Sequence, residues 1–317
     1  MIALELESTT LDRLAEAFGS RLQREIPLAR FTAARLGGPA EALIEVHTIE
    51  ELIQAVQLGW QEKIPLTVLG GGSNVLVSDA GMHGLVVINR AKSVRFEIEE
   101  EPPFVWAESG ANFGLLARQA AQHGLSGLEW AAGIPGTLGG AVVGNAGAHG
   151  QDMAATLRLA EILHHIGTER DEAVRREVWR VEKLDYSYRS SILKRDPDDV
   201  VVLAAELVLK QSTVQEVQSR IDDLVNYRRR TQPPGASMGS MFKNPPGDYA
   251  GRLIEAVGLK GYRIGDAQIS SLHANFFINL GNASAREIYE LIDRARKSVE
   301  DKFGVRLELE VELLGEW

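Results

Sequence analysis

The sequence predicts a mixed fold of the α/β or α+β class, because helix signals and strand signals interleave along the chain. The helix signals are Ser or Thr residues followed three positions later by Glu, the pattern of a helix N-terminus. The strand signals are short β-branched runs between those helices. A length of 317 residues favours about two domains, and 44% hydrophobic with 25% charged residues is ordinary for a globular protein.

Four helices can be placed from local signals. We expect one from Phe113 to His123, ending at Gly124. Three others begin at capping pairs, and the last of these carries an apolar stripe at helical spacing. The pairs are Thr48 with Glu51, Thr213 with Glu216, and Ser284 with Glu287, and the stripe is Ile288, Leu291, Ile292, Ala295 and Val299.

Five strands are expected from β-branched runs, at Leu66–Leu69, Leu85–Ile88, Val200–Leu209, Asn275–Asn279 and Leu307–Leu313. The last run alternates, with leucines and a valine on one face and three glutamates, including Glu310, on the other. Such acids usually face solvent, so Glu310 alone would be a weak candidate for a function. A linker is expected at 228–234, where a basic run precedes two prolines.

Composition and charge exclude several classes. A net charge of −10 argues against a non-specific nucleic-acid binder. Without cysteine, the chain has no disulfide, zinc–thiolate site or cysteine nucleophile. The first residues lack a signal peptide's basic flank and apolar core, so we expect a cytoplasmic protein. The uncharged stretch 130–151 contains seven glycines and a proline, so we expect buried loop and strand there, not a membrane span.

Two glycine-rich loops are candidate ligand sites. In 70–74, three glycines precede Ser and Asn after an expected strand, and consecutive small residues can form a nest of N–H groups for phosphate. This loop is neither a P-loop, because no Gly-Lys-Ser/Thr follows, nor a convincing Rossmann turn. The loop 133–140 has G-x-x-G-x-x-G spacing without a strand–helix context, and we expect it to cooperate with the first. The alternative for each loop is a tight turn.

Two further segments offer candidate catalytic groups. In YSYRSS, Arg189 could hold a carboxylate with both arms of its guanidinium, although a surface arginine at a strand end is an alternative. In ASMGSMFKNP, Ser240 lies in a turn of small residues beside Lys243 and Asn244. That segment does not match G-x-S-x-G, and no histidine is evidently paired as a base, so a serine hydrolase is weakly supported.

Seven motifs, taken in order, resemble the UDP-N-acetylenolpyruvoylglucosamine reductase family. They are RLGGPA, LGGGSNVLVSD, GLEWAAGIPGTLGGAVVGNAGA, YSYRSS, GSMFKNP, AQISSLHANFFIN and LELEVELLG. The resemblance runs from about Arg35 to Gly315. It implies an α+β fold with a two-lobed FAD-binding domain of the vanillyl-alcohol-oxidase (PCMH) type, then a smaller α/β substrate-binding domain. We expect the lobes at 1–90 and 91–228, and the substrate domain at 229–317.

The resemblance also implies the residues of the site. The catalytic trio would be Arg189, Ser240 and Glu310. Substrate would be bound by Tyr188, Lys243, Asn244 and Gln268. FAD would be held by Gly70, Gly71, Gly72, Ser73, Asn74, Gly133, Ile134, Pro135, Gly136, Gly139 and Gly140. No metal site is expected.

The implied reaction reduces the enolpyruvyl ether of UDP-N-acetylglucosamine enolpyruvate to UDP-N-acetylmuramate, a step of peptidoglycan precursor synthesis, with NADPH as co-substrate. We expect non-covalent FAD, since Cys is absent and Ser73 follows the glycines of the first loop. Arg189 would hold the substrate carboxylate, Glu310 in its acid form would donate to the enediolate, and Ser240 would protonate the α-carbon. Lys243 could hydrogen-bond the Ser240 hydroxyl or the phosphates.

The chain resembles the shorter subtype of the family, because only 192–199 separate YRSS from VVVLAAELVL and leave no room for an extra substrate-capping loop. His149 and Gly144 depart from the family pattern, where tyrosine and methionine are common. We expect a monomer that binds neither membrane nor nucleic acid. The alternatives are another FAD oxidoreductase of this fold acting on a sugar or hydroxy acid, a non-catalytic FAD- or nucleotide-binding protein, and a serine hydrolase.

Overall fold

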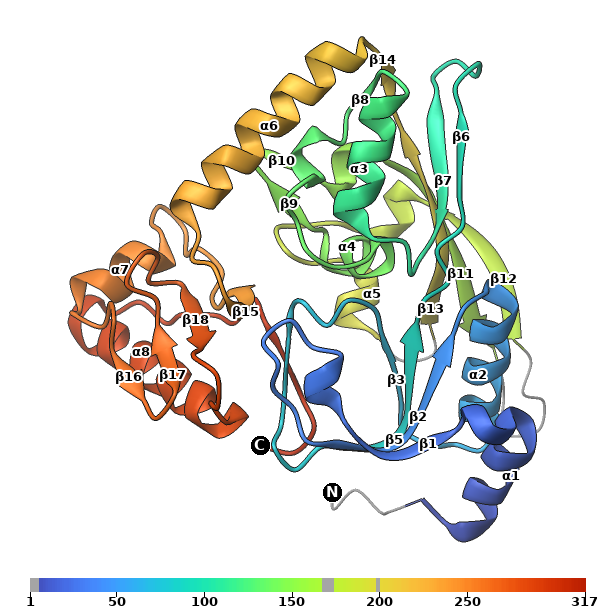
Figure 1. The fold of residues 1–317 in the computed structure, drawn as a ribbon, viewed down its shortest axis with the longest axis horizontal. Coiled ribbons are helices and arrows are strands. Elements are labelled where there is room, and N and C mark those ends of the chain that lie inside the picture. The colour runs from blue at the N-terminus through green and yellow to red at the C-terminus, as the bar shows by residue number, and fades with distance from the viewer. Residues whose placement is uncertain (1–5, 167–173, 198–199) are drawn as a thin grey trace.

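A computed structural model of the chain describes residues 6–166, 174–197 and 200–317. Three larger sheets, of four, five and four strands, organise these residues in chain order (Figure 1). Helices pack on each sheet, so the mixed helix and strand content predicted from the sequence is confirmed. None of the helices in the described ranges is long and apolar enough to cross a membrane.

The first sheet has the order β1-β2-β5-β3. Its central strand β5 pairs in parallel with β2 and β3, while β1 is an antiparallel edge. Leu52 and Val56 of the crossover helix are fully buried against the sheet, together with Leu14 of the first helix. The strands are β1 (Gln23–Pro27), β2 (Pro39–Val46), β3 (Leu66–Leu69) and β5 (Met82–Asn89), and the helices are α1 (Ser8–Phe18) and α2 (Ile49–Gln61).

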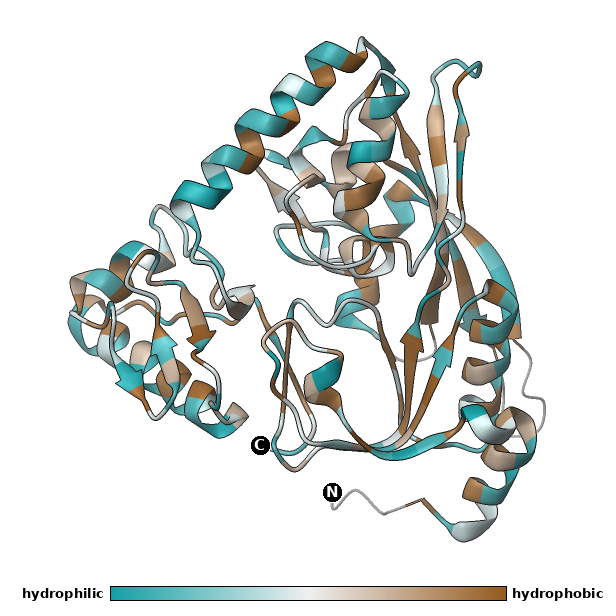
Figure 2. Cartoon of the chain, viewed as in Figure 1, coloured by the Kyte–Doolittle hydropathy of each residue, from teal (hydrophilic) through white to brown (hydrophobic). Residues whose placement is uncertain are grey.

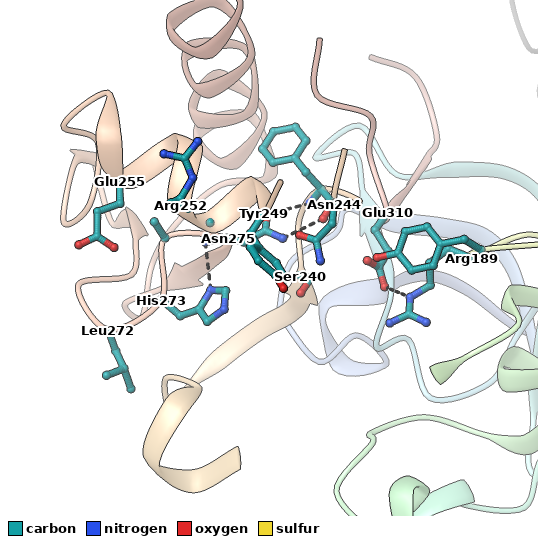
Figure 3. Close-up of a pocket in the computed structure, with 14 residues that line it drawn as sticks. Arg189, Ser240, Asn244, Tyr249, Arg252, Glu255, Leu272, His273, Asn275 and Glu310 are labelled. Atoms are coloured by element: carbon teal, nitrogen blue, oxygen red, sulfur yellow. Dashed lines mark hydrogen bonds and ion pairs between the residues drawn. The ribbon is translucent and has the colours of Figure 1, made fainter. Parts of the chain in front are cut away.

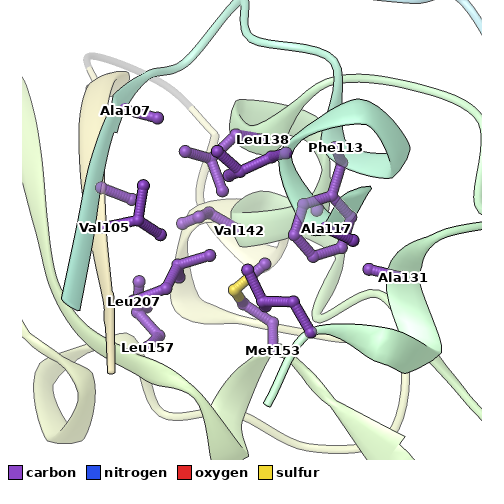
Figure 4. Packing of buried hydrophobic residues seen from close by; sticks show 14 of the residues in the cluster. Val105, Ala107, Phe113, Ala117, Ala131, Leu138, Val142, Met153, Leu157 and Leu207 are labelled. Carbon is purple, nitrogen blue, oxygen red and sulfur yellow. The ribbon is translucent and has the colours of Figure 1, made fainter. Parts of the chain in front are cut away.

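The second sheet is antiparallel, in the order β12-β11-β13-β7-β6. Its core lies between the sheet and two helices, where Phe113, Leu138 and Val142 face Val105 and Leu207 (Figure 4). The strands are β6 (Val94–Glu97), β7 (Phe104–Glu108), β11 (Leu157–His165), β12 (Val174–Arg180) and β13 (Val200–Val208), and the helices are α3 (Phe113–Gln122), α4 (Leu138–Gly144) and α5 (Ile192–Arg195). Two short ladders flank them, β8 (Leu125–Ser126) with β14 (Lys210–Gln211) and β9 (Gly147–Ala148) with β10 (Gln151–Asp152).

The third sheet is antiparallel, in the order β15-β18-β17-β16. The apolar stripe predicted in the last helix is buried against it, as expected. The elements are β15 (Ala236–Ser240), β16 (Arg263–Ile264), β17 (Ala267–Ile269), β18 (Phe276–Asn279), α7 (Ala250–Ala256) and α8 (Ala285–Phe303).

One helix and one strand connect the third sheet to the rest of the molecule. Helix α6 (Val214–Thr231) leads from the second sheet to the third along one side of the molecule (Figure 1). It is largely hydrophilic, and only Val217 and Ile221 are fully buried in it (Figure 2). The last strand, β19 (Glu312–Leu314), returns and pairs in parallel with β4 (Val75–Val77), directly after the first glycine-rich loop.

The capping signals located the helices correctly. The side chains of Thr48, Thr213 and Ser284 each accept a hydrogen bond from the backbone N–H three residues on. Of these three, Ser284 forms the complete capping box with its glutamate. Helix α3 starts at Phe113 as expected, and the chain leaves it through Gly124 at φ 67°, where glycine is favoured.

Two sequence predictions about secondary structure are wrong. The stretch 130–151 is not all loop and strand, because the Thr137 side chain caps α4 and Leu138 and Val142 bury one face of that helix. The strand expected over Leu307–Leu313 is shorter and later, since regular pairing begins at Glu312 and Leu309 makes only an isolated bridge with Phe242. The domain limits at 90/91 and 228/229 remain predictions, and α6 continues through the second to Thr231.

Candidate active site

The two glycine-rich loops lie directly against each other. A Cβ on Gly71 would come within 2.8 Å of the Cα of Gly136, and one on Gly70 within 2.2 Å of the Thr137 hydroxyl oxygen. The Ser73 hydroxyl donates to the Pro135 carbonyl oxygen at 3.1 Å. Because only glycine allows backbones to approach this closely, the predicted cooperation between the loops has a structural basis.

The first loop leaves backbone donors available for a ligand. Within the described residues, the N–H groups of Gly71, Gly72 and Ser73 donate to no protein acceptor. Gly71 is exposed and Ser73 half-buried, whereas Gly72 is buried and has the left-handed φ of 55°. Adjacent N–H groups without a protein acceptor in such a turn suit phosphate oxygens, so these residues fit a nucleotide cofactor.

Other predicted cofactor residues brace the loops. The Asn74 side-chain amide donates to the Glu310 carbonyl oxygen at 3.0 Å, so it ties the loop to the C-terminal segment. Gly139 is buried, and a Cβ there would lie 2.9 Å from that of Ser109, so packing already requires glycine. Ile134 is half-buried, whereas Pro135 and Gly140 are exposed. A helix does follow this loop, as α4, but a 3-10 turn at Glu129–Ala131 precedes it where a Rossmann turn has a strand.

The YSYRSS segment is anchored on α4. The Tyr186 hydroxyl donates to the Val142 carbonyl oxygen at 2.8 Å, and the fully buried Ser191 hydroxyl donates to that of Val143 at 2.6 Å. Burial raises the pKa of Tyr186, so its hydroxyl stays a donor. Between these anchors, Arg189 adopts a left-handed φ of 55° and is not the surface arginine at a strand end that was the alternative.

Arg189 and Glu310 form an ion pair. Nε of Arg189 donates to Oε1 of Glu310 at 2.6 Å, and the side chains are 22% and 16% exposed. Nη2 of Arg189 donates to the Gly147 carbonyl oxygen at 2.7 Å, and the guanidinium lies 5.3 Å from the centre of the Tyr188 ring. Glu310 therefore faces the interior of the site and not solvent, contrary to the expectation from strand alternation.

Ser240 is the last residue of β15, not part of a plain turn. The pairing of β15 with β18 shifts register between Ser237 and Ser240, and Gly239 has φ 79° at this irregularity. The backbone at position 239 has a left-handed conformation, which glycine adopts readily. This conformation turns the strand so that Ser240 lines the pocket. The Ser240 hydroxyl has no hydrogen-bond partner among the described residues and lines the same pocket as the ion pair.

A pocket of about 440 Å³ unites the predicted trio (Figure 3). Arg189 and Glu310 lie at one end, Ser240 and Asn244 near the middle, and Leu272 and His273 at the other end. Of the predicted substrate residues, Tyr188 and Asn244 line it. The remaining lining residues are Phe242, Tyr249, Gly251, Arg252, Glu255, Ala274 and Asn275.

Two predicted substrate residues do not line the pocket. Nζ of Lys243 lies 3.5 Å from Oε2 of Glu308, and no hydrogen bond joins it to Ser240 in the described structure. The Gln268 amide, on β17, donates to the Gly261 carbonyl oxygen at 3.3 Å. A hydrogen bond from Lys243 to the serine hydroxyl or to the substrate phosphates therefore stays a prediction, and in this structure the amine faces Glu308.

The other wall of the pocket includes residues that were not predicted from the sequence, Tyr249, His273 and Asn275. Asn275 is 3% exposed, and its side chain accepts from the Phe242 N–H at 3.0 Å and donates to the Phe242 carbonyl oxygen at 2.8 Å. These two hydrogen bonds fix the backbone at Phe242, two residues after Ser240. The predicted substrate residue Asn244 also lines the pocket and accepts from the Ala250 N–H at 3.1 Å, which orients the start of α7. The only feature of the sequence that could have indicated this wall is the segment HANF at 273–276, and its polar residues follow no periodic pattern.

His273 is half-buried in this wall. Burial lowers its pKa, and the positive charge of Lys260 acts in the same direction. Its Nδ1 accepts from the Asn275 N–H at 3.2 Å, which also favours the neutral ring. Among the residues that the structure describes, no group of three His, Asp or Glu side chains could hold a metal ion.

Family models match two parts of the chain. Residues 40–168 match an FAD binding domain, and residues 231–314 match the C-terminal domain of UDP-N-acetylenolpyruvoylglucosamine reductase. The predicted α+β fold with an FAD-binding domain is thereby supported by sequence as well as by structure.

Curated and solved relatives agree with these matches. A UDP-N-acetylenolpyruvoylglucosamine reductase of Chloroflexus aggregans is 42% identical over 95% of this chain and 100% of its own length. One of Rubrobacter xylanophilus is 46% identical over 92% of this chain and 94% of its own. The solved structure of UDP-N-acetylenolpyruvylglucosamine reductase from Thermus caldophilus has a TM-score of 0.77 and 38% identity, covering 93% of this chain and 99% of that one.

Proposed function

Because the chain belongs to the UDP-N-acetylenolpyruvoylglucosamine reductase family, we propose that the pocket holding Arg189, Ser240 and Glu310 is its active site. The enzyme is an FAD oxidoreductase that reduces UDP-N-acetylglucosamine enolpyruvate to UDP-N-acetylmuramate with electrons from NADPH. The observation that best supports this proposal is that three side chains from distant parts of the sequence line one pocket. These are the three residues that were predicted as a catalytic trio. We expect a cytoplasmic monomer that contributes to cell shape and division through peptidoglycan synthesis.

The glycine-rich loops would hold FAD. The free N–H groups at 71–73 suit its diphosphate, and the facing loop 133–140 would frame its ring system. FAD held there would supply the hydride chemistry that couples oxidation of NADPH to reduction of the enolpyruvyl group. Asn74 connects this cofactor loop to the backbone of Glu310, so cofactor and catalytic carboxylate share one support.

Arg189 would bind the carboxylate of the enolpyruvyl group. As negative charge spreads into that carboxylate during reduction, a fixed guanidinium stabilises it. The Gly147 carbonyl holds one arm of the fork, while the Nε edge is occupied by Glu310. A substrate carboxylate would therefore compete with Glu310 for Arg189. Glu310 would then be released from Arg189, and the role that the resemblance implies for it is to donate a hydrogen bond to the enediolate.

Ser240 would supply the proton for the α-carbon. Its hydroxyl is uncommitted within the described structure and opens on the pocket, so a substrate can use it without breaking a protein hydrogen bond. The bulge at Gly239 and the brace from Asn275 fix its position. Tyr188 and Asn244 would contact the substrate nearby, and the wall at 272–275 would take the part of the substrate beyond the enolpyruvyl group.

An anaerobic visible spectrum tests this function. Flavin absorbance should bleach when NADPH is added and return when UDP-N-acetylglucosamine enolpyruvate follows. Bleaching without return would reject the substrate and favour an oxidoreductase acting on another sugar or hydroxy acid. Such an oxidase would also produce peroxide from its substrate and oxygen. Failure of the purified protein to bind FAD at all would reject the role of the glycine loops.

A further inference from the structure

A half-buried arginine in the last turn of α6 packs against the second glycine-rich loop. A Cβ on Gly133 would lie 2.7 Å from Cδ and 2.9 Å from Nε of Arg228. The arginine side chain therefore rests directly on the Gly133 backbone, and any side chain at 133 would push it away. Arg228 reaches this loop from the helix that connects the second and third sheets.

Arg228 has no anionic partner among the described residues. It forms no ion pair and donates no side-chain hydrogen bond there, and burial alone lowers its pKa. A guanidinium remains charged at neutral pH, so a positive charge is partly removed from water without compensation by the protein. A helix C-terminus attracts cations, but the exposed Arg229 and Arg230 already meet that preference.

The surroundings connect Arg228 to the active site. The ring of His149 packs edge-on to that of Tyr227 with centres 5.7 Å apart, and the pKa of His149 is lowered by burial and by the charge of Arg228. Two residues earlier, the Gly147 carbonyl accepts from Arg189. The segment 147–150 thus contacts the catalytic arginine at one end and lies beside Arg228 at the other.

We propose that Arg228 binds an anionic part of FAD and positions the cofactor on the 133–140 loop. The inference rests on the proposed function, which places FAD at this loop. Two parts of FAD carry the required charge, the diphosphate and the ring system once it has been reduced. A guanidinium can pair with either through charge-assisted hydrogen bonds. The compensating anion that the protein lacks would then arrive with the cofactor.

The test measures FAD affinity of the apoprotein by fluorescence quenching, at low and high salt. Arg228→Met keeps an apolar stem against Gly133 but removes the charge, Arg228→Lys restores a cation, and Arg230→Met is the matched exposed control. We expect Arg228→Met to raise the Kd for FAD about 10- to 100-fold, the range for one hydrogen bond to a charged group. Arg228→Lys should recover part of the affinity, and Arg230→Met should bind like the unmodified protein.

Two further readouts distinguish which part of FAD is bound. If Arg228 pairs with the diphosphate, the affinity for riboflavin and the midpoint potential of bound FAD should be unchanged in Arg228→Met. If it pairs with the ring, the midpoint potential should become more negative in that variant. Thermal unfolding of the apoprotein should not fall in Arg228→Met, because an uncompensated charge has been removed.

Equal Kd and equal midpoint potential in Arg228→Met and the unmodified protein would overturn the inference. A lower apoprotein Tm that accounts for the weaker binding, with no rescue by lysine, would also overturn it by assigning Arg228 a structural role. If the unmodified protein itself bound no FAD, the proposed function would fail instead, so the two failures are distinguishable.

Discussion

Arg189 and Glu310 are 121 residues apart in the sequence and pair at 2.6 Å inside the pocket that Ser240 also lines. Arg189 is held by α4 through Tyr186 and Ser191, whereas Glu310 is held through its backbone by Asn74. The pair therefore joins the second-sheet lobe to the C-terminal segment. In the proposed function a substrate carboxylate would compete with Glu310 for the same cation, and this competition motivates the first prediction.

Replacement of Arg189 by lysine should lower kcat/KM about 100-fold or more. A lysine keeps the charge but cannot hold a carboxylate with a planar fork while it also donates to Gly147. Steady-state kinetics with varied enolpyruvyl substrate measure the effect. Arg195→Lys is a suitable control, since Arg195 pairs with Asp185 away from the pocket. Kinetics of Arg189→Lys equal to those of the control would show that the fork does not hold the substrate.

Substitutions of Glu310 should show whether this residue donates a hydrogen bond during the reaction or is only a surface acid. Glu310→Gln keeps an amide that can donate and should retain part of the activity, whereas Glu310→Ala should slow re-oxidation of the flavin by substrate about 100-fold or more. Glu312→Ala, which removes the neighbouring exposed partner of Lys194, should be nearly neutral. Normal turnover by Glu310→Ala would exclude Glu310 from the reaction.

Two glycine substitutions should have opposite effects on stability. Gly71→Ala places a Cβ 2.8 Å from the Gly136 backbone, so it should lower the free energy of unfolding by about 1–3 kcal/mol and weaken FAD binding. Gly144→Ala lies in α4 with no atom within 4 Å of the new Cβ and should raise it by about 0.5–1 kcal/mol. Denaturant unfolding measures both. Equal stability of the two variants would mean that the loops do not pack as described.

The neutral state of His273 predicts an acid-sensitive term in stability. Burial lowers its folded pKa below the unfolded value of about 6.5, so the unfolded chain binds the proton more readily. The stabilising contribution is present above that value and is lost as the pH falls through the window below it. The free energy of unfolding should therefore decrease less between pH 7.5 and 5.5 in His273→Asn than in the unmodified protein. Identical decreases would rule out this contribution.

Local signals predicted much of the fold. Capping residues act within one turn, so Thr48, Thr213 and Ser284 located helix starts without knowledge of the tertiary structure. Helix α4 escaped because its sequence LGGAVVG has weak intrinsic propensity and is stabilised by the Thr137 cap and by burial of Leu138 and Val142. The final strand was misplaced because tertiary contacts override its local pattern. Its alternation predicted solvent-facing glutamates, but Asn74 and the bridge to Phe242 redirect the chain.

The candidate site could be predicted only in part. Glycine clusters indicated a close approach of backbone, and the structure shows that approach between Gly71 and Gly136. No periodicity could bring Arg189, Ser240 and Glu310 together, so their grouping came from the resemblance and not from the residues. The wall formed by Tyr249, His273 and Asn275 was missed because loop polar residues acquire their roles only through tertiary contacts.

The most direct test of the account is stopped-flow measurement of both half-reactions, without oxygen, in Ser240→Ala. Reduction of the flavin by NADPH should be almost unchanged, because the role proposed for Ser240 is confined to reduction of the substrate. Re-oxidation by the enolpyruvyl substrate should slow about 10²- to 10⁴-fold, as expected for a lost proton donor. Ser237→Ala, on the same strand and outside the pocket lining, should leave both steps intact. Equal slowing of the two half-reactions in Ser240→Ala would make Ser240 structural and contradict the account.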